Sequence, residues 1–219
     1  MSGLHRATGI VGLMAAAVLA LSTSERRAVA ADHLDPPTRT DPAFDTTADR
    51  AADIADVYVW HTADNLVIAL TFAGPAPREQ RPTYDRDVLY TINISNAGFP
   101  TDPEISIRFR FGQDSSGNSG IEISGLPDGG PPLVGPVETT LSRNGILARA
   151  GLYDDPFFFD LQGFRETRST GNLQFVASRS FFSGTNDTSL VLQIPRSRVE
   201  TGNELNIWAT SARFGGQLQ

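Results

Sequence analysis

The chain has 219 residues, 25 of them acidic and 18 basic, all of the basic ones arginine, and a formal net charge of −7 at pH 7. So acidic a protein repels phosphate backbones, and the composition therefore argues against a nucleic-acid partner. The absence of cysteine excludes disulfides, thiolate zinc sites, iron–sulfur clusters and cysteine nucleophiles.

The first 30 residues have the three parts of a secretory signal peptide. Arg6 lies in a short amino-terminal part, an apolar run occupies residues 7–21, and Ala28-Val29-Ala30 fits the small-x-small cleavage rule. The run is shorter than the roughly 20 residues that a membrane-spanning helix needs. We expect a cleavable signal peptide at residues 1–30, no transmembrane anchor after processing, and a mature protein in the periplasm or outside the cell.

The remainder, residues 31–219, is expected to form one domain that opens with an extended arm at 31–52, where Pro36, Pro37 and Pro42 interrupt any regular element. After the arm, short β-branched and aromatic runs alternate with turn residues. The clearest run is 105–111, whose apolar residues alternate with polar ones, the pattern of a strand with one buried side. The expected strands are 57–61, 66–72, 88–94, 105–111, 121–123, 137–141, 146–150, 173–177, 190–194 and 205–210.

These runs predict an all-β fold, most simply a two-sheet antiparallel β-sandwich, with a partly open β-barrel as the alternative. The turn residues 62–65 join the first two runs as a β-hairpin. Residues 196–200 offer the one convincing helical turn, so few or no long helices are expected.

The predicted mature terminus is a candidate site for a transition metal. Cleavage after Ala30 would leave Ala31-Asp32-His33 at the start of the chain. The free amine, two backbone amides and the His33 imidazole could then surround one square-planar Cu²⁺ or Ni²⁺ ion. The alternative is that His33 only forms hydrogen bonds within the arm.

Acidic residues gather in two further places. Asp53 and Asp56 precede the first strand, whereas Asp154, Asp155 and Asp160 bracket three consecutive phenylalanines. Oxygen-rich loops of this kind can hold Ca²⁺, although aspartate at strand ends and turns also commonly caps backbone N–H groups. The phenylalanines, residues 157–159, cannot all face one side of a strand; we expect them to enter the core from a non-strand segment, with exposure to a ligand as the alternative.

Catalytic motifs are sparse. His61 ends the first hairpin strand, and no G-x-S-x-G elbow accompanies it. A surface or cross-strand role is therefore expected for His61. A hydrolase acting on polysaccharide would need two facing acids, for which Asp155 and Asp160 are the candidates.

Several segments resemble the bacterial domain-of-unknown-function family 4331, and they cover nearly the whole mature chain. They are residues 32–36, 53–60, 87–90, 108–111, 154–161 (DDPFFFDL), 186 and 207–210. The resemblance implies an exported protein and supplies no catalytic residues. The hairpin at 53–72 is also similar to the opening of the haem- and sugar-binding β-sandwich superfamily, but a haem would have only His33 and His61 as axial ligands in the mature chain.

Three functions follow as hypotheses. The leading one is a non-catalytic binding or envelope-associated module that takes a small ligand, a glycan or an envelope component, with Ca²⁺ and Cu²⁺ as candidate metals. The second is the polysaccharide hydrolase that uses Asp155 and Asp160. The third is a purely structural secreted protein.

Overall fold

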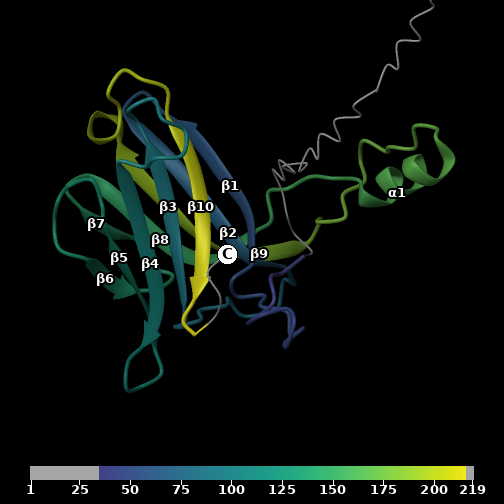
Figure 1. Ribbon diagram of the computed structural model, residues 1–219, viewed down its shortest axis with the longest axis horizontal. Helices are drawn as coiled ribbons and strands as arrows, with labels where there is room; N and C mark the ends of the chain where they lie inside the picture. Colours follow the sequence, from purple (N-terminus) through teal and green to yellow (C-terminus); the bar gives the residue numbers. More distant parts are fainter. Residues whose placement is uncertain (1–34, 216–219) are drawn as a thin grey trace, which may run out of the picture.

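The computed structural model describes residues 35–215, which form a β-sandwich with one helical excursion (Figure 1). The predicted signal peptide and the predicted metal ligands Ala31, Asp32 and His33 lie outside the described residues. Within residues 35–215, ten strands make two five-stranded sheets, and every neighbouring pair of strands is antiparallel. The predicted all-β sandwich is confirmed, and the sheets do not close into the alternative barrel.

The first sheet has β9 at its centre, between two hairpins. Its strand order is β1 (Ile54–His61), β2 (Asn65–Pro77), β9 (Thr185–Pro195), β8 (Ile146–Asp154) and β7 (Leu141–Arg143). The second sheet has the order β10 (Asn206–Arg213), β3 (Val88–Ser95), β4 (Ile105–Gln113), β5 (Ser119–Ser124) and β6 (Leu133–Pro136). A 3₁₀ turn, η1 (Arg196–Arg198), lies in the predicted helical turn.

Alternation along the strands builds the core between the sheets. In β4, Ile107, Phe109 and Phe111 are buried, whereas Arg108 and Arg110 face solvent. The ring of Phe72 from the first sheet lies 4.3 Å from that of Tyr90 in the second. Burial of these rings and of the aliphatic residues around them is the main stabilising contribution, because apolar area removed from water contributes roughly 25 cal/mol per Å².

Polar contacts tie the arm to the end of the sandwich where β10 finishes. The Tyr90 hydroxyl donates to the carbonyl of Ala51, and the Ser211 hydroxyl donates to that of Ala52 at 2.6 Å. Arg213 at the end of β10 pairs with Asp49 of the arm and, at 2.7 Å, with Asp85. Residues 49–52 of the arm are therefore packed on the domain.

Three sequence predictions were wrong in the middle of the chain. Residues 133–136, expected to be loop, form β6, and the expected strand 137–141 is the turn that leads into β7. Residues 173–177, expected to be a strand, do not form one. They follow an unexpected helix, α1 (Leu161–Thr170). The physical reason is that Asp160 caps the helix at Gly163 N–H and Gly171 ends it with a left-handed φ of 72°.

Residues 155–184, here called the excursion, connect β8 to β9 and contain α1. The excursion stands to one side of the two sheets (Figure 1). Among the helices of residues 35–215, none is long and apolar enough to cross a membrane.

Candidate functional site

Two of the predicted acidic residues converge on Tyr58, on the outer face of the first sheet. The Tyr58 hydroxyl donates to Asp56 Oδ2 at 2.8 Å. Burial, followed by this bond and by the charges of Asp56, Asp155 and Asp187, raises the pKa of Tyr58 far above its usual value. All three carboxylates are buried. Asp187 was not a candidate from the sequence. It lies near Asp155 because it pairs with Tyr153 of β8, two residues before Asp155.

The other predicted acids have separate roles. Asp53 is buried just before β1, and its carbonyl accepts the N–H of Ala73 at 2.9 Å. Asp154 is exposed and pairs with Arg78 at 3.2 Å.

Asp160 organises the excursion. Its carboxylate caps α1 at Gly163 N–H (2.9 Å), accepts the N–H of Val176 (2.8 Å) and binds Arg179 through two hydrogen bonds of 2.6 and 2.9 Å. The Arg179 contact holds the pKa of Asp160 well below its usual range. Capping of backbone N–H groups was the alternative to Ca²⁺ binding for these aspartates, and Asp160 has this capping role. The capping role lends no support to a catalytic pair of Asp160 with Asp155.

The described residues provide no cluster of metal ligands and no partner for a catalytic histidine in support of the sequence predictions. Across residues 35–215, no set of three or more histidine, cysteine, aspartate or glutamate side chains is arranged to hold a metal ion. His61 is exposed, and its Nδ1 lies 3.1 Å from the carbonyl of the next residue, Thr62. The Ca²⁺ prediction and the Cu²⁺ or Ni²⁺ prediction at Ala31, Asp32 and His33 therefore stay predictions.

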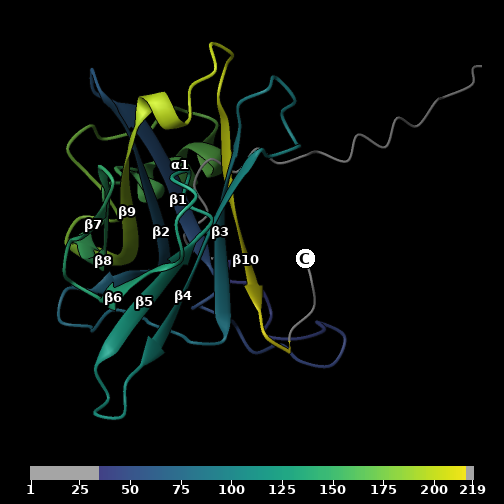
Figure 2. The same ribbon diagram turned by 90° about the vertical axis from the view of Figure 1, so that its left-hand side faces the viewer.

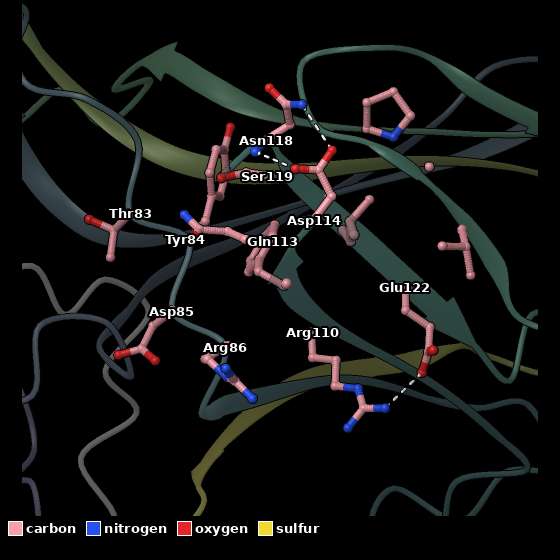
Figure 3. Close-up of a pocket in the computed structure, with 17 residues that line it drawn as sticks. Thr83, Tyr84, Asp85, Arg86, Arg110, Gln113, Asp114, Asn118, Ser119 and Glu122 are labelled. Carbon is pink, nitrogen blue, oxygen red and sulfur yellow. Dashed lines mark hydrogen bonds and ion pairs between the residues drawn. The ribbon is translucent and has the colours of Figure 1, made fainter. Parts of the chain in front are cut away.

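A hollow bordered by described residues lies at the end of the second sheet (Figure 3). It has a volume of about 1060 Å³ and lies between β4, β5 and β6 on one side and residues 83–86 of the β2–β3 connection on the other. The β4–β5 hairpin projects beyond the sheet at this end (Figure 2). A connection between two strands thus forms one wall of the hollow, and a regular sheet forms the other.

Two paired glycines leave the sheet side of the hollow without side chains at these positions. Gly112 of β4 pairs with Gly120 of β5, and Gly112 shares the outward face with Arg110 because side chains alternate along a strand. A Cβ atom on Gly112 would meet nothing within 4 Å, whereas one on Gly120 would lie 3.1 Å from the carbonyl oxygen of Gly135. The space above Gly112 is therefore open, and only a glycine fits comfortably at 120.

The charged side chains around the hollow already have internal partners. Arg110 lies 3.4 Å from Glu122 across the strands, with both side chains on the same wall in Figure 3. Asp114 accepts backbone N–H groups from Ser116 (2.8 Å) and Asn118 (2.9 Å), and the Asn118 amide side chain as well (2.9 Å). The bonds from Asn118 lower the pKa of Asp114. This end of the hairpin is a fixed turn that keeps its carboxylate ionised.

The opposite wall is held by Tyr84 and Asp85. The Tyr84 ring packs 4.8 Å from Phe111, and its hydroxyl lies 3.4 Å from Glu138; burial, then Glu138, raises the Tyr84 pKa far above its usual value. Burial opposes ionisation of Asp85, but the hydrogen bonds from Arg213 and from the Asp87 N–H, with the positive charge of Arg213, together outweigh it and lower the pKa of Asp85. Arg86, beside them, is exposed and only 3.8 Å from Asp87.

Comparisons of the chain with protein-family models, with curated proteins and with solved structures each find no match. The resemblance to family 4331 therefore stays a prediction, and the function has to be inferred from the geometry.

None of the candidate site residues predicted from the sequence lines the hollow. One signal was present. Gly112 and Gly120 each interrupt a strand, and a glycine inside a strand often marks a place where a ligand or another backbone approaches closely.

Proposed function

We propose that this protein is a non-catalytic binding module, and that its ligand is a neutral oligosaccharide held in the hollow between β4–β6 and residues 83–86. The observation that carries the proposal is the open space above Gly112. The side chains that border this space offer both hydrogen-bond donors and acceptors. Such a role fits the export that residues 1–30 predict.

The charges of the hollow favour a neutral, hydroxyl-rich ligand over a charged one. Two arginines, Arg86 and Arg110, face three acids, Asp85, Asp114 and Glu122, so neither sign dominates. Asp85, Asp114 and Glu122 already bind donors of the protein. A charged ligand would have to compete with these bonds. Hydroxyl groups both donate and accept hydrogen bonds, so they can use the donor and acceptor positions that remain free on the guanidinium groups and carboxylates.

The proposed role is non-catalytic because Asp160 and His61, two of the candidates from the sequence, do not form part of a catalytic group. Asp160 caps a helix and pairs with Arg179, and His61 lies exposed at the end of β1. A general acid–base pair needs groups within reach of the same reacting bond, and the carboxylates that line the hollow are instead engaged in ion pairs and turn hydrogen bonds.

The test adds a side chain to the floor. In Gly112→Gln, the new side chain enters open space, so the fold is retained while the ligand is obstructed. We expect amide NMR signals of Gly112, Gly120 and Arg110 to shift when cellohexaose, maltohexaose or chitohexaose is added to the wild type, and the affinity to fall about tenfold or more in the variant, which is at least about 1.4 kcal/mol.

Thr210→Gln is the matched control, because Thr210 is exposed on β10 of the same sheet and does not line the hollow. It should bind like the wild type. The proposal is overturned if none of the three sugars perturbs the spectrum, if the shifts fall outside the hollow, or if Gly112→Gln binds normally.

A further inference from the structure

The excursion carries an unusual set of exposed apolar side chains. Leu173 is 80% exposed and Phe158 is 61% exposed, although side chains of this kind are usually buried. The further exposed apolar residues of the excursion are Phe164, Phe175, Val176 and Phe181. A contiguous stretch of chain that presents so many apolar groups to water marks an interaction surface.

The exposed rings are held in place by a small aromatic cluster beneath them. Phe159 is at the centre of one half of it: its ring centroid lies 5.6 Å from that of Phe164 and 6.1 Å from that of Phe175. In the other half, Phe182 lies 5.1 Å from Phe181. Asp160 and Arg179 clamp the same segment through their paired hydrogen bonds. The apolar surface is therefore built on an ordered support.

The excursion does not share the negative charge of the whole protein. Its three arginines balance Asp155, Asp160 and Glu166, a net charge of zero, whereas the full chain has −7; both aspartates are buried. Arg179 is engaged with Asp160, but Arg165 and Arg168 are exposed on α1. The Arg168 guanidinium lies 5.8 Å from the Phe164 ring centroid, so positive charge and exposed aromatic surface occur side by side.

We propose that the excursion docks on an anionic lipid surface, independently of any ligand in the hollow. Phenylalanine and leucine side chains enter the boundary between headgroups and acyl chains, and arginines beside them bind lipid phosphates. The excursion stands away from the sheets (Figure 1), so it can meet a flat surface while the acidic sandwich stays clear of it.

A lipid surface fits this shape better than a second protein molecule does. Protruding side chains can enter a fluid interface one at a time, whereas a stable protein interface needs a complementary, well-packed surface. Charge complementarity favours an anionic surface in particular, because Arg165 and Arg168 lie on the segment that reaches it.

The experiment measures co-sedimentation with vesicles of phosphatidylcholine alone and of phosphatidylcholine with an equal part of phosphatidylglycerol. The chain begins at Ala31, because the apolar run at 7–21 would bind lipid by itself, and all described elements are retained. We expect binding to the anionic vesicles that weakens with salt. Phe158→Ser combined with Leu173→Ser should reduce the partition coefficient about tenfold or more, and Arg165→Gln combined with Arg168→Gln roughly thirtyfold.

The control replaces two exposed phenylalanines outside the excursion, Phe44 (90% exposed) and Phe99 (65% exposed), by serine. It should bind vesicles like the unmodified chain. The proposal is overturned if the unmodified chain does not bind anionic vesicles, if the control weakens binding as much as the excursion variants do, or if those variants bind normally. It is equally overturned if the chain forms a dimer in solution that the Phe158→Ser, Leu173→Ser pair abolishes, since the surface would then belong to a second copy.

Discussion

The core of the sandwich and the excursion are both built on phenylalanine, and they use it in opposite ways. Phe72 is fully buried between two sheets, with Tyr90, Phe109 and Phe111 around it. In the excursion, Phe159 and Phe182 support rings that stay exposed, and an ion pair supplements the packing. The difference shows that burial of a ring requires a second layer of structure over it. Between the two sheets the phenylalanine rings are covered and stabilise the fold, whereas in the excursion no second sheet covers them and some stay exposed.

The strongest test of the comparison is Phe72→Ala. Because the ring is completely buried, its removal should lower the free energy of unfolding by about 3–5 kcal/mol, measured by urea denaturation. Phe158→Ala, in the excursion, should change it by less than about 0.5 kcal/mol because that side chain is largely exposed. Equal losses in the two variants would contradict the contrast.

A local test is Asp160→Asn, which weakens the Arg179 pair while keeping a side chain that can still cap α1. Amide hydrogen exchange in residues 161–180 should become about tenfold faster, because a charged hydrogen-bonding partner is lost from a segment with little apolar packing. The exchange of β2 and β9 should not change. Asp154→Asn is the matched control, since the Asp154–Arg78 pair is exposed and such pairs contribute little. Faster exchange throughout the sheets would show that the excursion is not a separate unit.

The smallest effect is expected in the pH dependence of the excursion. The folded-state pKa of Asp160 is lowered by Arg179, so its stabilising contribution is complete above the ordinary aspartate pKa of about 3.9 and is lost as the pH falls through the lower folded value. The amide signals of Gly163 and Val176, which bind this carboxylate, should titrate with a midpoint below about 3.9. In Arg179→Gln the midpoint should move upward, and an unmoved midpoint would contradict the assignment of the shift to Arg179.

Most of the sandwich could be predicted from the sequence because alternation is a local signal. Residues 105–111 show it most clearly, and they form the greater part of β4. The Leu133–Pro136 strand could not be found in this way, because its pairing with β5 depends on neighbours distant from it in the chain, and prolines dilute its pattern.

The excursion shows where the local signal misleads. Residues 173–177 have the composition of a strand, but no sheet edge lies beside them, and they remain exposed. The cap residues of α1 were readable, since Asp160 and Gly171 stand at the positions that favour the start and the end of a helix. The phenylalanine run was expected to enter the core; it lies in a non-strand segment as predicted, but it packs within the excursion and leaves Phe158 exposed.

The sites were harder to predict than the strands. Asp56 and Asp155 were selected from the sequence and do approach Tyr58, but Asp187 became a member only through the pairing of β8 with β9. The hollow depends on the placement of residues 83–86 beside β4, which no spacing in the sequence reveals.

The position of β9 determines when this protein can fold. β9 lies between β2 and β8 in the first sheet, and β10 completes the second sheet beside β3. The two amino-terminal strands of the first sheet therefore wait for a partner more than a hundred residues further along the chain, and such distant pairings form slowly. A chain that stops before residue 185 would leave the two hairpins of the first sheet with no strand to join them, so this sheet cannot be completed until almost all of the polypeptide is present.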